Sequence, residues 1–115
     1  MSDEMLGLKF AISEAAQYFL FATLDRRTSG AVVVVQVGAN DGSMNDPVNP
    51  WVNTKGWRGV FIEPVAHFFN QLRQAYGDRE GLQFVLAACG DRQGTAEFYQ
   101  IRDPTTLPHS WMLGL

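Results

Sequence analysis

The sequence predicts an α/β fold built on a parallel sheet, and two features indicate it. Residues 32–37 are all valine except Gln36, the pattern of a strand that is apolar on both faces. Such strands belong to parallel sheets that helices cover on each side. The run leads into residues 38–42, Gly-Ala-Asn-Asp-Gly, a turn whose glycines permit a sharp bend and the close approach of a ligand. In doubly wound folds, ligands bind at the carboxyl end of such a strand.

Residues 59–63 predict a second buried strand, which ends in the carboxylate of Glu63. Glu63 lies 21 positions after Gly42, which leaves room for one crossover helix before the neighbouring parallel strand. Nucleotide-binding folds place the acceptor for ribose hydroxyls about 20 residues after a glycine-rich turn. The turn has the spacing G-x-x-x-G rather than G-x-G-x-x-G, which argues against a nicotinamide or flavin dinucleotide.

Both features also have a purely structural interpretation. The glycine-bounded segment is compatible with an ordinary strand-to-loop turn, in which Asn40 and Asp41 adopt left-handed backbone conformations. Glu63 is compatible with an acid at a helix amino terminus, stabilised by the helix dipole.

The remaining elements follow from periodicity and from stop signals. Residues 3–26 predict a helix whose apolar positions are mostly three or four apart. Its wide apolar stripe is explained by burial on two sides or by a lid or partner contact. A short helix is expected to begin with Asp46 as its N-cap and to stop at Gly56.

Pro64 is expected to open a further helix that Gly77 closes. Residues 82–88 predict a third strand, and the alternation over residues 96–101 predicts a half-exposed antiparallel strand. Residues 102–115 are expected to be loop.

Several of these motifs together resemble the FkbM-type family of S-adenosylmethionine-dependent methyltransferases. The similarity spans roughly residues 31–115. It is carried by residues 35–42, 56–64 and 87–91, by Phe69, Leu72, Tyr76, Gly94, Phe98 and Tyr99, and by residues 107–111 and 113–114.

The resemblance implies a Rossmann-like class I methyltransferase fold. It also implies methyl transfer from S-adenosylmethionine to a small-molecule or sugar-type acceptor, commonly at a hydroxyl oxygen. The cofactor-binding residues that it implies are Gly38, Asn40, Asp41, Gly42, Glu63, Ala88 and Cys89. The backbone amides of residues 40–42 would face the amino-acid portion of the cofactor, and residues 88–91, at the end of the third strand, would lie near the adenine.

The wider family often has an acidic residue where Gln36 stands, so attraction for the cofactor's ammonium group is expected to be weaker here. Cys89 is expected to be a small buried residue rather than a nucleophile. No catalytic base can be named. Residues 41–52 do not fit a calcium loop, because positions 6 and 12 would be Asp46 and Val52 rather than glycine and glutamate.

Composition narrows the class of protein. The chain has 115 residues, of which 46% are hydrophobic and 18% charged, which is typical of one globular domain. A net charge of −3 gives no electrostatic footprint for nucleic acid or an anionic membrane. Cys89 is the single cysteine and no basic leader is present, so we expect a cytoplasmic protein.

The domain is expected to be partial. Residues 1–29 would form the amino-terminal helix, 30–101 the cofactor-binding core and 102–115 a loop. A class I methyltransferase has further strands beside the valine strand, so the chain is expected to be truncated and to self-associate through an uncovered sheet edge. Three functions therefore stay open: a methyltransferase or its cofactor-binding half, a non-catalytic or degenerate nucleotide-binding fragment that pairs with another chain, and a Rossmann-like enzyme using another nucleotide.

Overall fold

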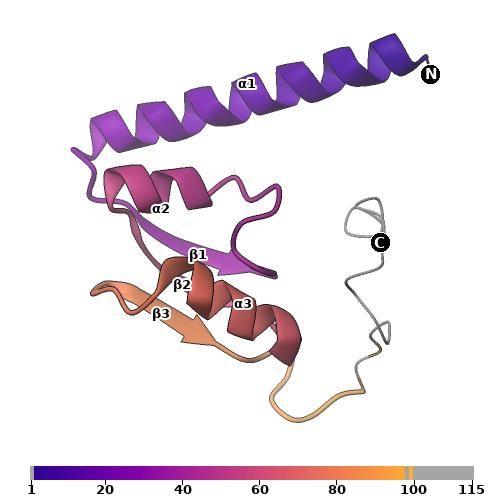
Figure 1. The fold of residues 1–115 in the computed structure, drawn as a ribbon, viewed down its shortest axis with the longest axis vertical. Helices are drawn as coiled ribbons and strands as arrows, with labels where there is room; N and C mark the ends of the chain where they lie inside the picture. The colour runs from indigo at the N-terminus through magenta and orange to yellow at the C-terminus, as the bar shows by residue number, and fades with distance from the viewer. Residues whose placement is uncertain (1, 98, 100–115) are drawn as a thin grey trace.

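The structure is a computed structural model that describes residues 2–97 and 99. After one long helix, strands and helices alternate along the chain (Figure 1). The elements are α1 (Asp3–Arg27), β1 (Val33–Val37), α2 (Asn49–Lys55), β2 (Arg58–Ile62), α3 (Ala66–Tyr76) and β3 (Leu82–Val85). The α/β class predicted from the valine run is confirmed.

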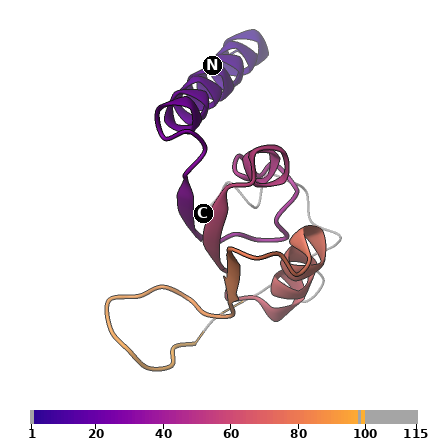
Figure 2. The same cartoon turned by 90° about the vertical axis from the view of Figure 1, so that its left-hand side faces the viewer.

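The three strands form one parallel sheet in the order β1-β2-β3. Val35 pairs with Val60, and Phe61 pairs with Phe84. Parallel neighbours need a crossover connection, and here α2 supplies the first and α3 the second. Both helices lie on the same face of the sheet, as the two views show (Figures 1 and 2). The arrangement is compatible with a Rossmann-like fold.

The hydrophobic core lies between this face and the two crossover helices. Phe61 is fully buried, and its ring centroid lies 4.9 Å from that of Tyr76 and 5.7 Å from that of Phe84. Leu72 of α3 is also fully buried. Burial of each such side chain contributes about 1.5–3 kcal/mol, so this layer holds α3 against the sheet.

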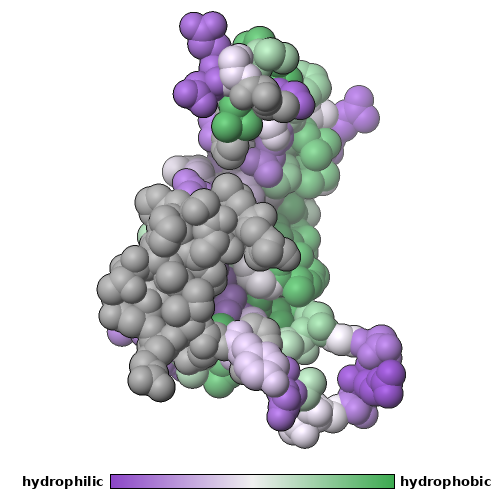
Figure 3. Space-filling model, turned by 90° about the vertical axis from the view of Figure 1, so that its right-hand side faces the viewer, coloured by the Kyte–Doolittle hydropathy of each residue, from purple (hydrophilic) through white to green (hydrophobic). Residues whose placement is uncertain are grey.

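No described residue covers the opposite face of the sheet. Val33, Val35 and Val37 alternate with the inward residues of β1, and their side chains are 58%, 66% and 60% exposed. Apolar residues gather along this side of the molecule (Figure 3). The expectation of helices on both faces is therefore wrong for the described chain, because both crossovers pass over one face.

α1 agrees closely with the predicted helix over residues 3–26. The Ser2 hydroxyl caps its amino terminus by accepting a hydrogen bond from the Met5 N–H at 3.2 Å. Every side chain described between residues 2 and 20 is exposed. Burial of α1 on two sides, one of the two explanations for its wide apolar stripe, is thus wrong.

The last turns of α1 attach it to the rest of the domain. The ring of Phe21 meets those of Trp51 and Trp57 edge-on, with centroids 6.2 and 5.5 Å apart. The Trp57 indole N–H donates to the Asp25 carboxylate at 2.7 Å. Tyr18 adds a tilted contact with Trp51 at 5.5 Å. One aromatic cluster therefore fixes the carboxyl-terminal part of α1 to α2.

α2 begins two residues later than predicted from Asp46 as its N-cap. Its N-cap is Val48, which has no side-chain acceptor, and Asn49 is its first residue. Asp46 still stabilises the start of the helix, because its Oδ1 accepts hydrogen bonds from the N–H groups of Val48 and Asn49 at 2.8 and 2.9 Å. The predicted end is confirmed, since Gly56 has the left-handed conformation of a C-cap at φ +69°.

The later elements are shorter than predicted. α3 begins at Ala66, two residues after Pro64, and ends before Gly77 as expected. β3 ends at Val85 rather than at residue 88. The antiparallel strand predicted over 96–101 is absent from residues 96, 97 and 99, and its other residues, with 102–115, lie outside the described chain.

Gly42 gives a test of how tightly α3 packs on the turn. A Cβ at this position would lie 2.7 Å from the Leu72 Cδ1 and 3.2 Å from the Tyr76 ring, and φ is +75°. We expect Gly42→Ala to lower the free energy of unfolding by roughly 1–3 kcal/mol through overpacking. Urea denaturation measures it.

Gly56→Ala is the matched control, because a Cβ there meets nothing within 4 Å while φ, at +69°, carries the same backbone strain. Equal unfolding midpoints for the two variants would contradict the packing of α3 against Gly42.

Candidate functional site

The glycine-bounded turn lies at the carboxyl end of β1, where the sequence predicts it. The N–H groups of Gly38 and Ala39 both donate to the Ile62 carbonyl of the neighbouring strand, at 2.8 and 3.0 Å. Gly38, Asn40 and Gly42 have positive φ values of +73°, +54° and +75°. The turn is thus anchored to the end of β2 and bends in the way its glycines permit.

Glu63 follows β2 and connects this turn to the start of α3. One carboxylate oxygen accepts the Asn40 N–H at 2.8 Å, and the other accepts the Val65 N–H at 3.0 Å. The residue is only 4% exposed. A buried carboxylate is tolerated when hydrogen bonds satisfy it, and the bond to Val65, the N-cap of α3, matches the structural interpretation of Glu63.

The amide groups of residues 40–42 are already bonded within the chain. The Asn40 N–H donates to the Glu63 carboxylate. The Asp41 N–H donates to the Asn40 Oδ1 at 2.8 Å, and the Gly42 N–H donates to the Ala39 carbonyl at 3.2 Å. The amides predicted to face a cofactor are therefore hydrogen-bonded within the chain in this conformation. The Asp41 carboxylate accepts hydrogen bonds from the N–H groups of Ser43 and Met44, both at 2.9 Å.

The two glycines of the turn have different surroundings. Gly42 lies under Leu72 and Tyr76, so packing alone requires glycine there. Gly38 is exposed, and a Cβ added to it would meet nothing within 4 Å. The backbone at Gly38 is therefore open to solvent.

Ala88 and Cys89 follow the end of β3 and belong to no regular element. The Glu63 N–H donates to the Val85 carbonyl at 3.0 Å, which marks the carboxyl end of β3. Ala88 and Cys89 follow in an exposed segment that leaves the sheet (Figure 2). The expectation of a buried Cys89 is wrong. The structure thus brings together Gly38, Asn40, Asp41, Gly42 and Glu63, while Ala88 and Cys89 are exposed residues that follow β3.

Comparison with protein families, curated proteins and solved structures finds no match for this chain. Within residues 2–97 and 99, no three His, Cys, Asp or Glu side chains cluster as metal ligands would. No helix in that part combines the length and apolar character needed to cross a bilayer.

A polar cluster beneath the loop before α2 is a feature that the sequence analysis missed. The Gln36 side-chain N–H donates to the Asp46 carboxylate at 3.1 Å, which ties β1 to the loop. Among the described residues, neither the Gln36 Oε1 nor the Tyr76 hydroxyl has a hydrogen-bond partner, although both atoms are buried. The Asn49 amide lies near the hydroxyl without completing a bond. The sequence could have indicated this cluster, because Gln36 and Tyr76 are polar residues on the inward faces of β1 and α3.

The environment of Tyr76 disfavours its ionised form. Burial raises the pKa of its hydroxyl well above the ordinary value, and the Asp46 carboxylate adds to that effect. Arg79 and Asn49 oppose it more weakly. Tyr76 is therefore a neutral core residue, not a proton donor or acceptor near neutral pH.

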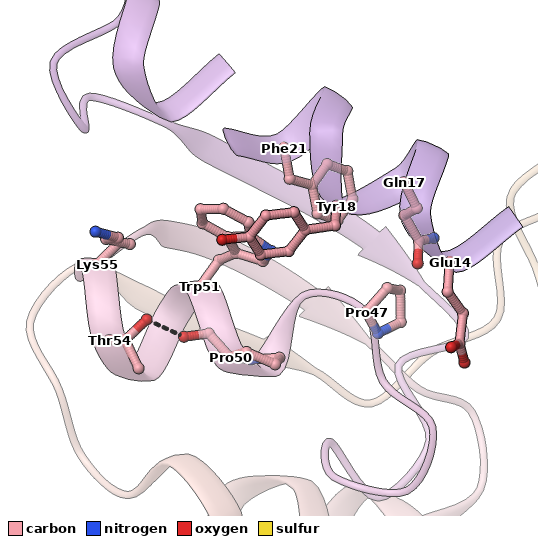
Figure 4. A pocket seen from close by; sticks show the side chains of 9 residues that line it. All are labelled: Glu14, Gln17, Tyr18, Phe21, Pro47, Pro50, Trp51, Thr54 and Lys55. Carbon is pink, nitrogen blue, oxygen red and sulfur yellow. Dashed lines mark hydrogen bonds between the residues drawn. The ribbon is translucent and has the colours of Figure 1, made fainter. Parts of the chain in front are cut away.

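A cleft of about 230 Å³ lies between α1 and α2, on a different part of the surface from the predicted site. Tyr18 and Phe21 form one wall, and Trp51 with Pro50 forms the other (Figure 4). Glu14 and Lys55 lie at opposite ends in this view. Because its walls come from residues far apart in the sequence, spacing could not indicate it.

We expect Glu63→Gln to destabilise the fold. The amide can accept one of the two backbone N–H groups but presents its own N–H₂ to the other, leaving a buried donor unsatisfied at a cost of about 1–3 kcal/mol. Chemical denaturation measures the loss, and faster hydrogen exchange at the Asn40 amide reports the released turn. Glu80→Gln, at an exposed position, is the control; if it costs as much, the Glu63 bonds contribute no stability.

Tyr76→Phe is expected to leave stability unchanged or to raise it near neutral pH, because the buried hydroxyl makes no hydrogen bond. A raised folded-state pKa means that stability falls once the pH exceeds the unfolded value near 10. Tyr76→Phe should lack this part of the stability loss at alkaline pH, because it has no hydroxyl to ionise. Thermal unfolding at pH 8 and pH 11 tests both statements, and an equal alkaline loss in the two proteins would count against the burial of the hydroxyl.

Proposed function

We propose that this chain is the cofactor-binding part of an S-adenosylmethionine-dependent methyltransferase of the FkbM type. The main support for this proposal is the hydrogen bond from the Asn40 N–H to the Glu63 carboxylate. It joins a carboxylate at the end of β2 to the glycine turn at the end of β1. Both features lie at the carboxyl edge of a parallel sheet, where α/β folds bind their ligands.

The residues fit a nucleoside ligand in part. An ionised carboxylate offers about four acceptor positions, and the two bonds of Glu63 to backbone N–H groups leave capacity for ribose hydroxyls. Gly38 offers open space for close approach to the backbone. Because Glu63 is only 4% exposed, a ribose would have to approach it along the turn, beside Gly38.

When bound, S-adenosylmethionine would supply an activated methyl group on a sulfonium. The chain's own contribution in this proposal is to hold the nucleoside through Glu63 and the Gly38 turn, because positioning supplies much of the rate of an in-line displacement. A hydroxyl acceptor also needs its proton removed. No described residue is assigned that role.

The second candidate is a non-catalytic nucleotide-binding module that pairs with another chain. The internal bonding of the amides at residues 40–42 favours it, since these groups hold the turn rather than await a ligand. Transfer of a labelled methyl group from S-adenosylmethionine to a small hydroxyl acceptor distinguishes the two functions. Binding of another nucleotide in place of S-adenosylhomocysteine would indicate a Rossmann-like enzyme of a different kind.

Gly38→Val tests the site itself. The variant should lose binding of S-adenosylhomocysteine, measured by titration calorimetry, because its side chain fills the space beside the turn. Glycine also relieves strain at φ +73°, so the variant will lose some stability as well.

Gly56→Val is the matched control. Gly56 has φ +69° and open surroundings, but it ends α2 away from the turn. The two variants should be similarly destabilised, and only Gly38→Val should lose binding. If both bind as the parent does, the turn does not contact the cofactor and the proposed function fails.

A further inference from the structure

We propose that two copies of this chain form a symmetric dimer in which α1 of each copy covers the exposed sheet face of the other. The exposed sheet face, here called the valine face, carries apolar residues from all three strands. These are Val33, Val35, Val37, Val60, Ile62 and Val85, and the strand register places Arg58 and Gln83 on the same face. This dimer does not depend on the proposed function.

The valine face lacks the cover that its strands require. Parallel sheets occur almost only with both faces covered, usually by helices. Here α2 and α3 occupy one face, while Val35 stays 66% and Val85 41% exposed. The polar residues of this face are peripheral, because Arg58 lies at the amino-terminal end of β2 and Gln83 lies on the edge strand β3. A largely apolar helix would therefore provide the missing cover.

α1 exposes apolar side chains on several sides, and one row of them is suited to the valine face. Leu8, Ile12 and Phe19 are 62%, 60% and 71% exposed, and their spacing of four and seven residues places them on one side of the helix. We call these three residues the outer stripe. Leu8 and Phe19 are about 16 Å apart along the helix, close to the roughly 17 Å length of a five-residue strand. The outer stripe therefore matches the valine face in length as well as in chemistry.

α1 cannot cover its own sheet with this stripe. Phe21 and Asp25 already fix its last turns to Trp51 and Trp57. Phe19 lies about 200° around the helix from Phe21, because each residue advances the helix by about 100°. Turning the outer stripe onto the same chain's valine face would break the aromatic cluster and the indole bond. In the proposed dimer, the cover comes from a second copy of the chain.

A second copy supplies both halves of the contact. Each chain carries one uncovered sheet face and one outward apolar stripe, which is the self-complementarity that a two-fold interface requires. In such a dimer, each valine face receives a helix and each outer stripe is buried. This arrangement differs from pairing through the open edge of β1, which would leave both valine faces in water.

Sedimentation analysis of the 115-residue chain tests the stoichiometry. We expect a species of twice the 12.8 kDa chain mass. Ile12→Lys and Val35→Lys should each shift it to the monomer, with an increase in the dissociation constant of at least tenfold. Leu20→Lys is the control, because Leu20 is 63% exposed but lies off the outer stripe. Circular dichroism verifies that each variant remains folded.

Disulfide trapping tests the geometry. On a Cys89→Ser background, a chain with Ile12→Cys is mixed with a chain with Val35→Cys and oxidised. We expect the mixed cross-link to dominate over cross-links between identical chains. Leu20→Cys replaces Ile12→Cys in the control mixture and should cross-link poorly. A monomer, an aggregate without defined stoichiometry, or predominant Val35–Val35 cross-links indicating edge pairing would each overturn the proposal.

Discussion

Parallel pairing of neighbouring strands is the constraint from which most of this architecture follows. Each crossover must return the chain to the end where the next strand starts, so a helix has to pass over the sheet. Because the order is β1-β2-β3, both crossovers run in the same direction and share one face. The same arrangement that buries Phe61 and Leu72 leaves Val35 in water.

The Glu63 carboxylate is the main polar link in this framework. With 4% exposure it must be hydrogen-bonded, and its partners come from two different elements: the turn after β1 and the start of α3. The proposed cofactor-binding role of Glu63 would therefore use the same oxygens as its structural role. The turn lies at the edge of the sheet, and its N–H groups at Asn40 and Gly42 are already hydrogen-bonded within the chain.

α1 shows how a helix can be predicted well and placed wrongly. Its limits follow from Ser2 and from the polar segment after Arg27, which are local signals. Its exposure follows from contacts with residues far along the chain, namely Trp51 and Trp57. Only the last turns meet them, so most of an apolar helix projects away from the domain (Figure 1).

By itself, the sequence determined the features that depend on neighbouring residues. The valine strand, the glycine turn, the helix ends at Gly56 and Gly77, and the position of Glu63 at the end of β2 all follow from local backbone preferences and side-chain periodicity. The cofactor assignment came instead from resemblance, and the structure leaves it as a proposal.

Tertiary structure alone decided which groups face each other. It made Gly42 a packing site and left Gly38 open, joined Gln36 to Asp46, and left Cys89 exposed. These outcomes depend on how far each strand runs and on which face each crossover takes. Both are set by contacts between distant segments, and periodicity within one segment does not encode them.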